Sequence, residues 1–138
     1  MKRLPPASFA LLAVLFFSAC ATGRINISYE LSPEELIQRA QEASDRNRFN
    51  HALQFYQALL DRNPGNLALV VNAEYEIGFI HYRQRNLDEA RVWLNTLLER
   101  YEAPGGEALP EKFRVLAHVV LGRIDERENR RPRWGRRS

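Results

Sequence analysis

The chain has 138 residues, of which 27% are charged and 45% hydrophobic, and its formal net charge is +3. This length suits one domain with its own hydrophobic core and is too short for two domains of ordinary size. The basic excess is confined to the ends, because residues 20–128 hold 13 basic and 17 acidic residues. Since nucleic-acid-binding domains present a clustered basic face, we expect no nucleic-acid partner.

The N-terminus has the order of a secretory signal: two basic residues, an apolar run over residues 7–17, and then small residues. The run is shorter than the roughly 20 apolar residues of a membrane-spanning helix. It ends in Phe-Ser-Ala-Cys at Cys20, the only cysteine of the chain. This ending resembles the lipobox of bacterial lipoproteins, although Phe17 replaces the usual leucine. The resemblance implies cleavage after Ala19 and lipidation of Cys20, and the alternative is an ordinary signal peptide followed by an unpaired cysteine.

The residue after the cysteine bears on localisation. In bacterial lipoproteins an aspartate at this position usually signals retention in the inner membrane, and this chain has Ala21. The resemblance therefore implies an outer-membrane lipoprotein that faces the periplasm. Residues 1–19 are then the signal peptide, and residues 20–31 are expected to form a short polar tether between the lipid and the first helix.

The mature chain is predicted to be all-helical, because its apolar residues recur at helical spacing and no segment alternates with period two. Ser32, Pro33 and Glu35 form a capping box with proline at the first helical position. Asn86 and Glu89 repeat the cap pattern. The predicted helices cover residues 32–47, 49–62, 68–85, 86–101 and 110–128, and residues 129–138 are expected to form a disordered basic tail.

An internal repeat with an offset of 38 residues relates Ala52 to Ala90. Each alanine follows a large apolar residue by three positions, and each is preceded twelve residues earlier by a small residue, Ala40 or Gly78. Small residues at these positions allow paired helices to approach closely. The unit resembles the tetratricopeptide repeat (TPR), a helix–turn–helix motif, and the resemblance covers residues 32–128.

The match to the TPR motif has agreements and departures. Gly78, Tyr56 and Pro64 occupy motif positions, whereas Glu74 and His81 stand where the motif has tryptophan and tyrosine. The resemblance implies an all-α fold of two TPR-like helical-hairpin repeats followed by a C-terminal capping helix. A five-helix bundle of another kind is the alternative.

An aromatic stripe on the third helix, formed by Tyr75, Phe79 and Tyr82, is the candidate binding surface. Its members recur at spacings of four and three residues, which places them on one face of the helix. In TPR proteins the first helix of each repeat lines a concave groove that binds peptides or partner helices, and aromatic residues and arginine dominate such contacts. The alternative is that the fifth helix covers the stripe, which then belongs to the core. The groove residues that the resemblance implies are Tyr75, Phe79, Tyr82, Arg83, Gln41, Asp45 and Arg48.

The sequence contains no recognisable catalytic constellation. The three histidines lack the spacing of a metal site, and no phosphate loop, nucleophile elbow or dinucleotide-binding motif is present. We therefore predict no catalytic residues, no metal and no cofactor, and an enzyme is the least favoured class.

Two functional classes remain open. The first is a membrane-anchored scaffold that binds another envelope protein or peptide, as TPR lipoproteins of envelope assembly do. The second is an accessory of periplasmic solute uptake that docks a binding protein or a small hydrophobic ligand, which predicts a closed apolar pocket between the third and fifth helices. The basic tail is expected either to contact anionic lipid headgroups or to be a solvated terminus.

Overall fold

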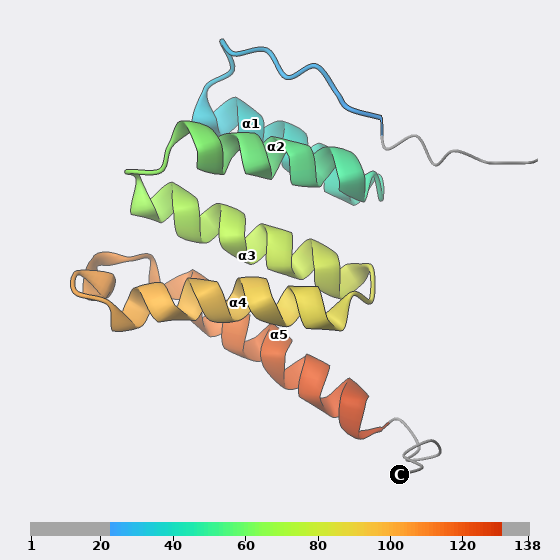
Figure 1. Cartoon of the computed structure of the whole chain (residues 1–138), viewed down its shortest axis with the longest axis vertical. Helices are drawn as coiled ribbons and strands as arrows, with labels where there is room; N and C mark the ends of the chain where they lie inside the picture. The colour runs from blue at the N-terminus through green and yellow to red at the C-terminus, as the bar shows by residue number, and fades with distance from the viewer. Residues whose placement is uncertain (1–22, 131–138) are drawn as a thin grey trace, which may run out of the picture.

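The computed structural model describes residues 23–130, and within this range the chain is helical without any strand, as the sequence predicted (Figure 1). The signal peptide, Cys20 and the tail from residue 131 lie outside the described residues. The helices are α1 (Pro33–Asp45), α2 (Phe49–Arg62), α3 (Leu67–Arg83), α4 (Leu87–Glu102) and α5 (Glu111–Asn129), with a short 3-10 helix, η1 (Gly106–Ala108), before α5.

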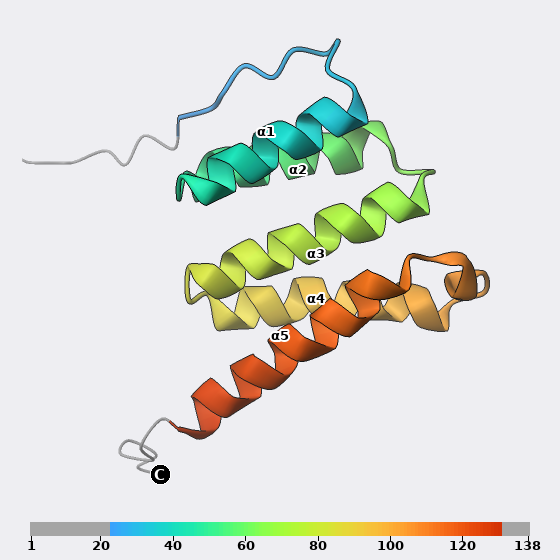
Figure 2. The same ribbon diagram turned by 180° about the vertical axis from the view of Figure 1, so that it is seen from behind.

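The five helices form two hairpins and a final single helix. Helices α1 and α2 pair, as do α3 and α4, and α2 also packs against α3. Helix α5 lies against both α3 and α4. Figure 1 shows α2 and α4 in front of α1 and α5, and Figure 2 shows α1, α3 and α5 from the other side.

The turns that close the two hairpins have the same geometry at the offset of 38 residues. Asn47 has a φ angle of 56° and Arg85 has a φ angle of 65°. Residues other than glycine rarely adopt this left-handed backbone conformation. The N–H of the next residue then donates across each turn, from Arg48 to the carbonyl of Ala43 (2.8 Å) and from Asn86 to that of His81 (3.0 Å). The offset in the sequence is therefore also an offset in backbone structure.

Helix starts agree with the sequence in one case and differ in another. The capping box at α1 is confirmed, since Ser32 Oγ accepts from the N–H of Glu35 (3.2 Å) and the Glu35 carboxylate accepts from the N–H of Ser32 (2.9 Å). The expected cap by the Asn86 side chain is wrong, because α4 begins directly after the left-handed turn and has no side-chain cap. Asn66, which was not predicted, caps α3 by accepting from the N–H of Leu69 (3.2 Å).

Small residues lie where the helices of each hairpin meet. Ala40, Ala52 and Ala90 are fully buried. A Cβ atom at Gly78 would lie 3.0 Å from the Leu94 side chain, which is tighter than ordinary van der Waals contact. Glycine at this position therefore allows α3 and α4 to approach closely.

The N-terminal arm (residues 23–31) is packed along α2, although the sequence predicted a tether there. The Gln54 amide donates to the carbonyl of Gly23 (3.1 Å) and accepts from the N–H of Ile25 (3.0 Å). Further along, Arg62 donates to the carbonyl of Ser28 (3.0 Å). Only residues 20–22 of the expected tether lie outside this arm.

Candidate functional site

The structure places two of the three stripe residues in the core. Tyr75 and Tyr82 are 7% and 8% exposed, because α5 crosses over them. The Tyr75 ring lies 5.8 Å from the Phe113 ring, and the Arg127 guanidinium lies 4.2 Å from the centre of the Tyr82 ring. Of the two alternatives for the stripe, these two residues therefore follow the core alternative and do not line a groove.

Phe79 is only half-buried and continues the same aromatic stack. Its ring lies 5.9 Å from that of Tyr75 and 6.1 Å from that of Tyr82. Together with Phe113, these rings pack between α3 and α5.

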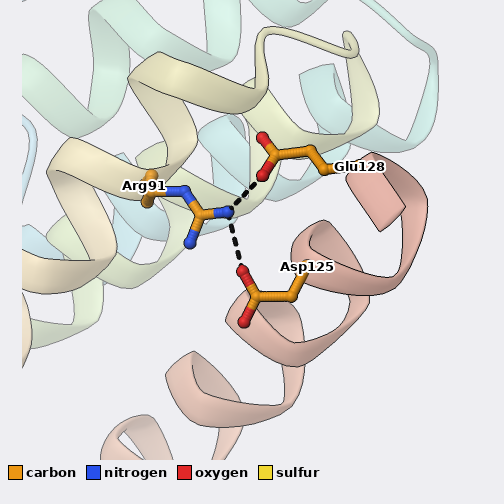
Figure 3. Close-up of polar contacts among 3 residues, drawn as sticks. All are labelled: Arg91, Asp125 and Glu128. Carbon is orange, nitrogen blue, oxygen red and sulfur yellow. Dashed lines mark hydrogen bonds and ion pairs between the residues drawn. The ribbon is translucent and has the colours of Figure 1, made fainter. Parts of the chain in front are cut away.

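Polar contacts at both ends fix α5 over the stripe. Near its C-terminal end, the Arg91 guanidinium on α4 donates to Asp125 (2.7 Å) and Glu128 (2.8 Å), as Figure 3 shows. At the start of α5, the Tyr101 hydroxyl donates to the carbonyl of Pro110 (2.7 Å). These contacts fix the rotation of α5 about its axis, and therefore which of its residues face away from the core.

The predicted residues on α1 and at the end of α3 remain accessible. Gln41 and Asp45 are exposed on α1, and Arg83 is exposed on α3. Arg83 also donates to Ser44 Oγ (2.8 Å) and to the Asn47 side-chain oxygen (3.1 Å), which ties α3 to the first hairpin. These three predicted residues thus share the side of the molecule built by α1 and α3.

Glu76 is a residue of this surface that the sequence analysis missed. It is half-buried, and burial raises the pKa of its carboxyl group, while the positive charges of Lys112 and Arg83 lower it and the charge of Asp45 raises it. Charges on α1, α3 and α5 therefore converge on Glu76. The sequence did contain a signal for Glu76: it precedes Phe79 by three residues, which places the two side chains on the same face of the helix. We call this surface the α1–α3–α5 face: Gln41, Asp45, Glu76, Phe79, Arg83 and Lys112.

Arg48, the remaining predicted residue, lines an open pocket of about 270 Å³ at the α1–α2 turn together with His51 and Gln84. Another open pocket, of about 300 Å³, lies between α2 and α4, and its lining includes Leu53 and Trp93. Both pockets are open to solvent, and the lining of the second also includes His81 on α3 and Glu89 on α4.

Within residues 23–130, no group of three or more histidine, cysteine, aspartate or glutamate side chains is placed to hold a metal ion. None of the helices in this range combines the length and the apolar character needed to cross a membrane.

Comparison with known proteins finds a similar protein in a bacterium. An uncharacterized protein of Treponema pallidum (strain Nichols) is 34% identical over 123 residues, which is 88% of this chain and 49% of that protein. The chain therefore spans about half the length of this relative. No family model matches the chain, and no solved structure matches it.

Proposed function

We propose that this chain is a lipid-anchored protein of a bacterial cell envelope, in which a TPR-like unit of two helical hairpins binds another envelope protein or peptide. The observation that carries the proposal is the repeated turn, with left-handed Asn47 and Arg85 at an offset of 38 residues. The same offset relates the buried alanines Ala52 and Ala90. Binding of a partner follows by analogy with other TPR units.

The α1–α3–α5 face is the proposed binding surface. It combines an aromatic ring, Phe79, with the positive charges of Arg83 and Lys112 and the negative charges of Asp45 and Glu76. Aromatic residues and arginine contribute most to binding hot spots, and mixed charges select partners by complementarity. A partner segment with an apolar side chain between charges of both signs fits this arrangement.

The N-terminal arm supports anchoring close to the membrane. Its first described residue, Gly23, is hydrogen-bonded to Gln54 on α2. Cys20 precedes Gly23 by three residues, and three residues span at most about 10 Å. A lipid on Cys20 would therefore hold the first hairpin near the membrane surface, and Ala21 favours the outer membrane.

Substitution of the lipidated residue tests the anchoring. In the full chain, Cys20→Ser should block processing and release the protein from the outer membrane, because the acyl chains supply the membrane affinity. The matched control Ala21→Asp should keep the acyl chains, detected by mass spectrometry, and move the protein to the inner membrane. Unchanged processing and unchanged membrane fractionation of Cys20→Ser would contradict the proposal.

Partner binding requires a separate test. Crosslinking in intact cells should yield an adduct with wild-type protein that is lost when Asp45 is replaced by lysine and Arg83 by glutamate. The control, with Arg39 and Arg46 on the outer side of α1 replaced instead, should keep the adduct. If both double variants behave like the wild type, the α1–α3–α5 face does not bind the partner.

A further inference from the structure

Helix α5 has a second apolar face opposite to its core face. Val115 is 51% exposed, Val119 is 44% exposed and Leu116 is 39% exposed. These residues lie within little more than one helical turn and form one patch. Contiguous exposed apolar residues on a soluble domain commonly mark an interaction surface. The residues that α5 buries against α3 and α4 are Phe113, Ala117, Val120 and Ile124.

Gly122 continues this patch. A Cβ atom at this position would meet no atom within 4 Å, so packing within the described residues does not require glycine there. Glycine also lowers the stability of a helix relative to alanine. An exposed helical glycine beside two exposed valines allows another helix to approach the α5 backbone closely.

Two charges beside the patch lie symmetrically about Val119, whereas Arg123, which is also exposed, would lie opposite Val115 of an antiparallel second copy. Lys112 precedes Val119 by seven residues, and Glu126 follows it by seven residues. Leu116 and Gly122 likewise lie three residues before and three residues after it. All four are exposed. Apart from Arg123, the sequence of this face is therefore complementary to itself when two copies run in opposite directions.

We propose that this face of α5 binds the same face of a second copy of the chain, as an antiparallel helix pair with a two-fold axis at Val119. In this arrangement Lys112 faces Glu126 of the second copy, and Leu116 packs over Gly122 of the second copy. Each contact occurs twice, as in any isologous interface.

The contacts inside the protomer are compatible with this pairing. Asp125 and Glu128 bind Arg91 on α4, which keeps the patch directed away from the core. Glu126 pairs with Arg130 at 3.1 Å, but both side chains are largely exposed. Exposed pairs of this kind contribute little. Within its own protomer Lys112 Nζ lies 4.5 Å from the centre of the Phe113 ring, so this exposed side chain turns from that ring to join Glu126 of the second copy.

Analytical ultracentrifugation of the full chain with Cys20→Ser tests the pairing without the lipid. A mild detergent is present, because this variant keeps the apolar run over residues 7–17. We expect a dimer that Val119→Glu converts to a monomer. Lys112→Glu should weaken dimerisation about tenfold, because like charges then face each other twice, and the added change Glu126→Lys should restore it. A monomer for the starting protein, or no recovery in the double variant, would overturn the proposal.

Gly122→Leu separates loss of the dimer from loss of the fold. Leucine has a higher helix propensity than glycine, so the melting temperature of the monomer should not fall. The added side chain would collide with Leu116 of the second copy, and the dimer should be lost. A dimer that persists in this variant would contradict the pairing.

Disulfide formation tests the register in the same background, since Cys20 is the only native cysteine. Val119→Cys should form a covalent dimer on oxidation, because the two-fold axis brings the two thiols together. The matched control is Val92→Cys on α4, which replaces a valine that is 59% exposed and should remain monomeric. Equal crosslinking of the two variants would exclude this register. Such a result would leave the proposed membrane anchoring and partner binding unaffected.

Discussion

Glu74 accepts two hydrogen bonds from Arg100, from Nε at 2.7 Å and from a terminal nitrogen at 2.6 Å. The glutamate side chain is 4% exposed and the arginine side chain is 36% exposed. The residue 38 positions before Glu74 is Leu36, which is buried to 1% exposure. One position of the repeat thus holds a leucine in the first hairpin and half of an ion pair in the second.

Removal of the arginine should destabilise the domain. Arg100→Met leaves the Glu74 carboxylate buried without its partner. Breaking a fully buried pair costs roughly 3–5 kcal/mol, and we expect about 2 kcal/mol here because Arg100 is partly exposed, with a fall in melting temperature on the order of 8 °C. Thermal unfolding measures the effect.

Leu36, which holds the same repeat position as Glu74, suggests a substitution that should compensate for the loss of Arg100. The double variant Glu74→Leu with Arg100→Met should recover most of the lost stability, since apolar replacements of buried pairs are often neutral. As a control, Arg46→Met removes an exposed pair with Glu42 at the end of α1 and should leave the melting temperature unchanged. An Arg100→Met variant as stable as the wild type would show that the pair does not hold the hairpin together.

The contact between α3 and α4 at Gly78 should not tolerate a larger side chain. Gly78→Leu would push against Leu94 and Trp93, which already lie 3.0 Å and 3.3 Å from a Cβ atom at this position. Overpacking should outweigh the gain in helix propensity and cost about 1–2 kcal/mol. The control is Gly65→Leu, because a Cβ atom at Gly65 would meet no atom within 4 Å. This variant should have the melting temperature of the wild type. Equal melting temperatures for both variants would refute this packing.

Stability should fall at mildly acidic pH because of His81. Burial lowers the pKa of His81 from its usual 6.5, with Glu89 opposing the shift, and its Nδ1 atom is buried without a hydrogen-bond partner among the described residues. As pH falls through about 6.5, the unfolded chain takes up a proton that the folded state binds less readily. The free energy of unfolding therefore decreases as the pH falls below about 6.5.

Melting temperatures between pH 7.5 and pH 5.5 test this effect. The wild type should lose more stability over this interval than His81→Gln, which cannot be protonated. The control His118→Gln replaces an exposed histidine on α5 and should keep the dependence of the wild type. If His81→Gln and the wild type show the same change with pH, another group is responsible.

Local patterns in the sequence predicted much of this fold. Helical periodicity gave the five helices, and Ser32 with Glu35 gave the start of α1. The repeat offset between Ala52 and Ala90 reappears in the matching turns. These features depend on residues close together in the chain, or on residue size at helix contacts, and both can be recognised without knowing the tertiary structure.

Long-range packing was the part that the sequence left open. A stripe such as Tyr75 and Tyr82 has the same spacing whether it binds a partner or lies in the core, and the position of Phe113 over Tyr75 decides between them. The N-terminal arm was missed for a related reason. Gln54 and Arg62 hold it through bonds to its backbone, and such bonds leave no periodic pattern in the sequence.

Site-specific photocrosslinking in intact cells tests the central claim, that the α1–α3–α5 face binds an envelope partner. With a photoreactive residue at Gln41 or at Phe79, we expect the same adduct from both positions, in the membrane fraction and with a mass other than twice that of the chain. Glu99, an exposed residue on α4, serves as the control position and should give no such adduct. No adduct from either test position, or an equal yield at Glu99, would contradict the account.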